Sequence, residues 1–351
     1  MSEGRVESGE LKFGDGDNAP GGDAFKPQPP VTSVQSHQSP NQKAWLRFKH
    51  NRPAVFSAWF LAALVLLVIA WPLLLKSATF LGQGGKAFAM QHDPDTLSDS
   101  AFDAPTAKHW CGTDANGRDL FSRILFGAQI SLLVGAVGAS VSLVIGVLWG
   151  AVAGYLGGRW DDALMRFVDV LYSLPSIIFV IVLITTLEGR IKHFLDFFNS
   201  PGLSHMTRLC FLFIGLGAVS WLNMARIVRG QVLTLRNRAF VEASRTLGAG
   251  HRHILFRHIL PNVLGVVIVY LTLTVPAIIL YESFLSYLGL GIQQPMASWG
   301  TLIADGAGQI NTVRVYWWLL VYPGVILTAT LLALNFLGDG LRDAWDVRGD
   351  K

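Results

Sequence analysis

Long uncharged stretches of apolar residues alternate along the chain with shorter polar segments. The first, residues 53–75, would extend roughly 34 Å as a helix, which is enough to cross the hydrocarbon core of a bilayer. Similar stretches occupy residues 129–154, 163–187, 209–225, 263–285 and 315–337. The pattern predicts an all-α integral membrane protein with about six transmembrane helices.

Two features inside these stretches predict how the helices pack and bend. Small residues recur at every fourth position in the second stretch, where they would form a groove along one helix face. They are Gly138, Ser142, Gly146, Gly150, Gly154 and Gly158. We favour packing of this groove within the chain over an interface between subunits. Pro175 and Pro323 each remove a backbone donor, so we expect local bends there.

The composition agrees with a membrane protein. Hydrophobic residues make up 51% and charged residues 15% of the 351 positions, a balance that soluble domains rarely show. The formal net charge of only +4 argues against a broad basic surface for nucleic acid. Cys111 and Cys210 form neither a disulfide framework nor a metal-ligand pattern.

The chain divides into four expected segments. Residues 1–42 contain few large apolar residues, so we expect them to be disordered and cytoplasmic. Residues 43–128 form the first transmembrane helix, which begins too late for a cleaved signal peptide, followed by an outer loop and an interfacial helix. Residues 129–345 form a five-helix core with a cytoplasmic loop at 227–262. Residues 346–351 form a cytoplasmic tail.

Positive charge predicts the orientation of these segments. Lys and Arg residues cluster before the first apolar stretch and between the fourth and fifth, and such segments lie in the cytoplasm. An even number of helices then puts both termini on the cytoplasmic side. Loops 76–128, 188–207 and 286–314 face outside.

The polar loop between the fourth and fifth stretches has helical periodicity of its own. Phe240, Ala243 and Leu247 recur on one face, and Gly248 ends the pattern. A second short helix, 251–260, follows and runs into the next apolar stretch. Two amphipathic helices joined by a glycine elbow would rest on lipid headgroups or dock on another protein, and amphipathicity alone leaves both alternatives open.

The order of residues in this loop favours docking. The segment "EASRTLGAGHRHILFRHILPN" resembles the EAA loop of ABC importer permeases, in which this element docks into a groove of the ATP-binding subunit. Ser244 replaces the second alanine of the family pattern, and His258 is typical of the peptide-importer branch. The coupling residues that the resemblance implies are Phe240, Glu242, Ala243, Ser244, Leu247, Gly248 and Pro261.

Other segments resemble the second permease of dipeptide and oligopeptide importers, over residues 45–348. They include "GTDANGRDLFSRILFGAQISL" at 112–132, "YESFLSYLGLGIQQPMASWGTLI" at 281–303 and "NFLGDGLRDAWD" at 335–346. Val347 departs from the proline usual in the family. The extracytoplasmic motif consists of Gly112, Thr113, Asp114, Gly117, Arg118 and Asp119. An apolar stripe beside Arg118 and Arg123 predicts an interfacial helix on the outer surface.

The chain offers little chemistry of its own. No Walker A sequence is present, so the resemblance implies that ATP and Mg bind to partner subunits and that this chain binds no cofactor. The loop histidines lack a metal-ligand pattern. We expect Asp169 to pair with Arg166, one turn back. Glu282 has either a structural hydrogen-bonding role or a role in lining the transport path.

The resemblance implies the permease subunit of an ATP-driven importer of dipeptides or oligopeptides in the cell inner membrane. Its partners would be ATP-binding subunits, a second homologous permease, an external solute-binding protein and the lipid bilayer, with no nucleic acid. An ABC permease for nickel chelates or glycosides, and an ion-coupled secondary transporter, are the alternatives. The sequence contains no internal repeat and no charged midplane cluster, which argues against a secondary transporter. No catalytic arrangement supports an enzyme.

Overall fold

The computed structural model describes residues 40–345, except 184, 187–203, 295 and 311–313. These described residues are nearly all helical, and their only β pairing is an isolated bridge between Thr113 and Asp119. The predicted all-α fold is therefore confirmed. The segment expected to be disordered lies outside the described residues except for its last three, which begin α1 (Pro40–His50). The C-terminal tail also lies outside them.

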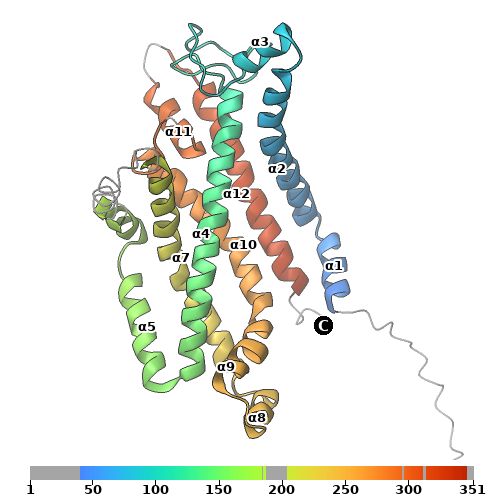
Figure 1. Cartoon of the computed structure of the whole chain (residues 1–351), viewed down its shortest axis with the longest axis vertical. Coiled ribbons are helices and arrows are strands. Elements are labelled where there is room, and N and C mark those ends of the chain that lie inside the picture. The colour runs from blue at the N-terminus through green and yellow to red at the C-terminus, as the bar shows by residue number, and fades with distance from the viewer. Residues whose placement is uncertain (1–39, 184, 187–203, 295, 311–313, 346–351) are drawn as a thin grey trace, which may run out of the picture. The chain divides into compact units, whose positions relative to one another are not determined.

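The long helices run side by side (Figure 1). They are α2 (Arg52–Ala78), α4 (Leu120–Leu156), α7 (Ser204–Leu235), α10 (Leu260–Tyr287) and α12 (Trp318–Trp345). Helix α4 packs on α7 and α10, and α12 packs on α2 and α10. Among the described residues, 4 helices are long and apolar enough to cross a membrane, or up to 5 if a bent pair forms one span. The predicted number of six is thus approximate.

Shorter helices lie at the two ends of these long ones (Figure 1). At one end, here called the loop end, are α3 (Gln83–Gln91), the loop that leads to α4, and α11 (Trp299–Gly308). At the other end, here called the elbow end, are α8 (Ala239–Thr246), α9 (His251–His253) and the π-helical turn η2 (Ile254–Ile259).

Several predicted helix boundaries were wrong. Helix α4 begins at Leu120, because the Asp119 side chain caps it by accepting a hydrogen bond from the Ser122 backbone N–H at 3.0 Å. The expected interfacial helix is therefore the first part of α4. Helix α7 continues to Leu235, so Arg226 and Arg229 lie on it and not in a loop. Residues 251–260 are continuous with α10 through η2 and do not form a separate helix.

The expected third span is broken at the predicted proline. Helix α5 (Gly158–Tyr172) ends before Pro175, and a second helical segment, Ser176–Leu183, follows at an angle of 88°. Proline removes one backbone donor and disfavours helical geometry at the residue before it, which accounts for the break. By contrast, α12 continues as a helix through Pro323.

The small-residue groove packs against α7, as expected for packing within the chain. A Cβ atom added at Gly146 would lie 2.6 Å from Cβ of Met224, and one added at Gly150 would collide with the carbonyl oxygen of Ala225. Gly158 does not belong to the groove. It follows the end of α4, has a φ of +56°, and has open space around it.

Candidate coupling surface and loop-end cavity

Helix α8 packs against the neighbouring helices of the elbow end through one buried side chain. Val241 is fully buried, in a cluster that includes Ile254, Leu255 and Ile259. The predicted apolar stripe faces outward instead, with Phe240 41% and Leu247 88% exposed. Burial of a large apolar side chain is favourable by about 1.5–3 kcal/mol. The stripe therefore has the properties of a docking surface for an apolar partner.

A glycine turn holds α8 in place. Gly248 has a φ of +82°, and its backbone N–H donates to the Arg245 carbonyl oxygen at 2.9 Å. The Ala249 N–H donates to the Ser244 carbonyl oxygen at 3.0 Å. These two bonds form a Schellman motif, which satisfies the last carbonyl groups of a helix and requires a left-handed residue. The predicted glycine elbow therefore has a defined geometry.

The elbow is attached to three long helices. The Tyr155 hydroxyl, on α4, lies 2.9 Å from Nδ1 of His251, and the Arg245 guanidinium lies 6.0 Å from the centre of the Tyr155 ring. Arg236, just after α7, donates from Nη1 to the carbonyl oxygens of Gly154 and Tyr155 at 3.3 Å. A cation at a helix C-terminus is favourable. Arg236 thus joins α7 to α4, and Val241 of α8 shares its buried cluster with Val228 and Val232 of α7. Because η2 continues into α10, the elbow is in contact with all three helices.

The remaining coupling residues lie at the ends of these elements. Glu242 is exposed in the first turn of α8, and Ser244 Oγ donates to the Phe240 carbonyl oxygen at 2.8 Å. Pro261 follows η2 within the continuous helix His251–Tyr287, where its missing N–H removes a helical hydrogen bond, in keeping with the π-helical turn just before it. No group of residues suited to a metal ion occurs in the described part of the chain.

At the loop end, the motif that was predicted to be extracytoplasmic folds around the Asp114 carboxylate. Its Oδ1 accepts from the backbone N–H groups of Asn116 and Arg118 at 2.8 and 2.9 Å. Its Oδ2 accepts from Arg118 Nε at 2.7 Å and from Arg123 Nη1 at 2.8 Å. Both arginines are buried. The prediction that they lie on an interfacial helix at the outer surface was wrong, because both pair with Asp114 inside the protein.

The other motif residues complete this turn. Gly112 and Gly117 have φ values of +81° and +71°, and a Cβ atom added at Gly112 would lie 2.6 Å from the Asp103 carbonyl oxygen. The Thr113 hydroxyl accepts from the Asp103 N–H at 2.8 Å. Asp119, besides capping α4, lies 2.9 Å from Nδ1 of His109. The structure thus brings all six predicted residues together at the start of α4.

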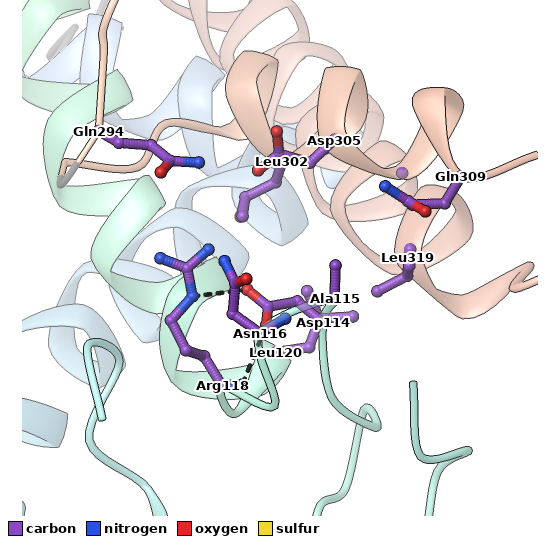
Figure 2. A pocket seen from close by; sticks show the side chains of 11 residues that line it. Asp114, Ala115, Asn116, Arg118, Leu120, Gln294, Leu302, Asp305, Gln309 and Leu319 are labelled. Carbon is purple, nitrogen blue, oxygen red and sulfur yellow. Dashed lines mark hydrogen bonds and ion pairs between the residues drawn. The ribbon is translucent and has the colours of Figure 1, made fainter. Parts of the chain in front are cut away.

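A cavity of about 170 Å³ separates this turn from α11 (Figure 2). Arg118 and Asn116 lie on the side of the turn, and Gln294, Asp305 and Gln309 lie on the other side. These polar side chains are set in a lining that is more apolar than polar, to which Leu302 and Leu319 contribute. The cavity can therefore offer hydrogen bonds and charge to a small polar group.

Glu282 is fully buried between α4, α10 and α11. Its Oε1 accepts from Ser286 Oγ at 2.7 Å and its Oε2 accepts from Ser131 Oγ at 3.2 Å. Each serine oxygen in turn accepts a backbone N–H, from Ile292 at 3.0 Å and from Trp299 at 3.3 Å. Of the two predicted roles, this geometry favours the structural one, because the carboxylate joins α4 and α10 to the segment that leads into α11.

The expected pairing of Asp169 with Arg166 was wrong. Asp169 Oδ1 instead lies 2.7 Å from Nη2 of Arg226 on α7, and both side chains are partly exposed. A second pair was not predicted: Asp161 on α5 accepts from Arg229 on α7 through both carboxylate oxygens, at 2.5 and 2.7 Å. Both pairs join α5 to α7, so these acids contribute to helix packing.

Comparison with known proteins identifies the family. The family described as "Binding-protein-dependent transport system inner membrane component" matches residues 146–348. The chain belongs to this family. A second family, the N-terminal TM domain of oligopeptide transport permease C, matches residues 39–98 of this transport component. The predicted membership among ABC importer permeases is confirmed, and the chain is a transport permease.

Several named permeases are similar to this transport component over most of its length. The oligopeptide transport system permease protein OppC of Escherichia coli (strain K12) is 46% identical over 305 residues, which cover 87% of this chain and 90% of the relative. The dipeptide transport system permease protein DppC of Bacillus subtilis (strain 168) is 41% identical over 305 residues, covering 87% and 85%. Among solved structures, the MetNI methionine ABC transporter has a TM-score of 0.48 at 19% identity, over 64% of this chain and 97% of that chain.

Proposed function

We propose that this permease is the membrane subunit of an ATP-driven importer that carries dipeptides or oligopeptides. The similarity to oligopeptide and dipeptide permeases over 87% of the chain supports the substrate class. The exposed stripe of α8, held on a buried Val241 and a glycine turn, supports the coupling to a partner subunit and is the observation on which the mechanism rests.

The mechanism begins at the elbow end, which lies in the cytoplasm together with both termini. An ATP-binding subunit docks on the stripe formed by Phe240, Ala243 and Leu247. ATP and Mg bind in the partner subunits, and closure of these subunits on ATP pushes α8. The push reaches α4 through Tyr155, α7 through the contact of Val241 with its buried cluster, and α10 through η2. The helices then rock from an inward-open to an outward-open arrangement.

The remaining partners act at the loop end and across the membrane. A second, similar permease pairs with this one, and helices of both line the central path. An external solute-binding protein delivers the peptide at the loop end. ATP hydrolysis belongs to the partner subunits, so the chain itself carries no catalytic residue.

Co-purification of the complete importer in mild detergent tests the docking surface. Phe240→Gln places a polar side chain in the stripe, and Thr246→Gln places the same side chain on an exposed position of α8 outside the stripe. We expect the Phe240→Gln permease to lose the ATP-binding subunits and to retain the second permease. The Thr246→Gln permease should retain both. Full recovery of the ATP-binding subunits with Phe240→Gln would exclude the stripe as their docking surface.

A further inference from the structure

The loop-end cavity contains an arginine whose hydrogen-bonding capacity is only partly used. Arg118 is 7% exposed, and its Nε donates to Asp114 at 2.7 Å. Figure 2 shows its two terminal nitrogens pointing away from Asp114, on the side of Gln294. Within the described residues these terminal nitrogens make no hydrogen bond or ion pair. Buried donors without an acceptor are energetically unfavourable, so the terminal nitrogens of Arg118 favour binding of an acceptor group.

Arg118 shares its carboxylate partner with a second arginine. Asp114 is the carboxylate partner of both Arg118 and Arg123, at 2.7 and 2.8 Å. One negative charge therefore serves two positive ones, and Arg123 Nε is also buried without a hydrogen-bond partner in the described chain. Asp305, across the cavity, adds a second negative charge but forms no ion pair with either arginine. A guanidinium fork with free terminal nitrogens binds a carboxylate through two parallel hydrogen bonds.

The opposite side of the cavity offers acceptors and donors for a peptide group. Asp305, on α11, is exposed and makes no hydrogen bond or ion pair with other described residues. The side-chain amides of Gln294 and Gln309 lie on the same side (Figure 2). An ionised carboxylate only accepts hydrogen bonds, such as those from N–H groups, whereas a side-chain amide both donates and accepts them. These side chains suit the N–H and C=O groups of a peptide bond.

The size of the cavity limits what it holds. Its volume of about 170 Å³ is below the roughly 300–1,000 Å³ of pockets that enclose a drug-sized ligand. It has room for the end of a peptide and not for a whole oligopeptide. We propose that this cavity binds the C-terminal carboxylate of the transported peptide on Arg118, with the last peptide bond against Asp305 and the two glutamines. This inference rests on the proposed peptide transport and names a subsite for it.

Binding of trialanine to the complete importer in lipid nanodiscs, without the solute-binding protein, tests the subsite. Saturation-transfer NMR measures weak binding of a small peptide, and trialanine amide is the matched probe without the carboxylate. We expect trialanine to bind and the amide not to compete. Arg118→Lys keeps the charge and loses the fork, so the Kd for trialanine should rise at least about tenfold.

Gln294→Glu provides a second variant, because Gln294 is exposed and the substitution adds a negative charge opposite the bound carboxylate. The Gln294→Glu substitution should also raise the Kd for trialanine. If Arg118→Lys prevents assembly of the importer, the Kd of Gln294→Glu still tests the subsite. An unchanged Kd in Gln294→Glu, or equal competition by the amide, would overturn the proposal. The proposal would also be overturned if either variant lost the ATPase stimulation by the binding protein while its Kd for trialanine stayed unchanged. The cavity would then be a contact site for the binding protein. Absence of ATP-driven trialanine uptake by the unmodified importer would instead refute peptide transport itself.

Discussion

Replacing Gly248 with alanine tests whether the glycine turn holds α8 rigidly. Gly248 has a φ of +82°, and an added Cβ atom would meet no other atom within 4 Å. The substitution therefore changes the backbone preference and removes no contact. An L-residue in the left-handed region costs about 1–2 kcal/mol, which shifts the equilibrium between the closed and opened turn by a factor of about 5–30.

Hydrogen exchange measured on the complete importer reports this shift directly. The amides of residues 247–249 close the turn onto α8, so we expect them to exchange about 5–30 times faster in Gly248→Ala. Peptide uptake should fall while co-purification with the ATP-binding subunits is preserved, because the exposed stripe is unchanged. Gly248→Asn should give a smaller effect, since asparagine tolerates the left-handed region.

Gly250→Ala is the matched control. Gly250 has a φ of −67° and a ψ of 153°, which alanine adopts without strain, and it also has open space around it. Exchange of α8 should stay the same or become slightly slower. If Gly248→Ala exchanges like the unmodified protein, or if Gly250→Ala has the same effect as Gly248→Ala, the turn does not depend on the left-handed glycine and the rigid-lever argument fails.

Three further predictions concern other parts of the molecule. Gly150→Leu should lower the free energy of unfolding by about 3 kcal/mol or more, because the new side chain would collide with α7. Gly230→Ala, which has open space around it, should be neutral or stabilising. Equal melting temperatures of the two variants would contradict this packing. Glu282→Leu should lower the free energy of unfolding by about 1–3 kcal/mol for each serine hydroxyl that loses its acceptor, and Glu282→Gln should lower it by less. Thermal unfolding measures both, and a larger loss of stability with Glu282→Gln would contradict the structural role. Burial and the charge of Asp119 raise the pKa of Cys111 to about 11. In a Cys210→Ser background, maleimide should therefore label Cys111 about a hundredfold more slowly at pH 8 than an ordinary thiol, and the rate should still rise above pH 9. Labelling at the rate of an ordinary thiol would contradict the burial.

The features predicted correctly from sequence are those that depend on nearby residues. The apolar stretches contain enough information to identify transmembrane helices, because the bilayer demands a long apolar segment. The spacing of Gly146, Gly150 and Gly154 identifies a helix face, and Gly248 identifies a turn, because both are local properties. The order of residues around Gly248 then identified the family.

The features that were wrong depend on contacts between distant parts of the chain. Asp169 was assigned to Arg166 because the two lie one turn apart, but Arg226 on α7 binds it instead. Arg118 and Arg123 are a local exception: Asp114 lies only four and nine residues away, but apolar periodicity does not show the turn that brings its carboxylate to both. The apolar pattern predicts too early an end for α7, because the last turns of this helix contain polar residues. In the structure Arg226 and Arg229 are part of α7, where acids of α5 pair with them.

Uptake of labelled trialanine by proteoliposomes that contain the complete importer tests the central claim most directly. The solute-binding protein is supplied outside, and either ATP or an ion gradient is supplied as the only source of energy. The account predicts accumulation with ATP at the elbow end and none with a proton or sodium gradient alone. Accumulation driven by a gradient in the absence of ATP would contradict it and would favour a secondary transporter.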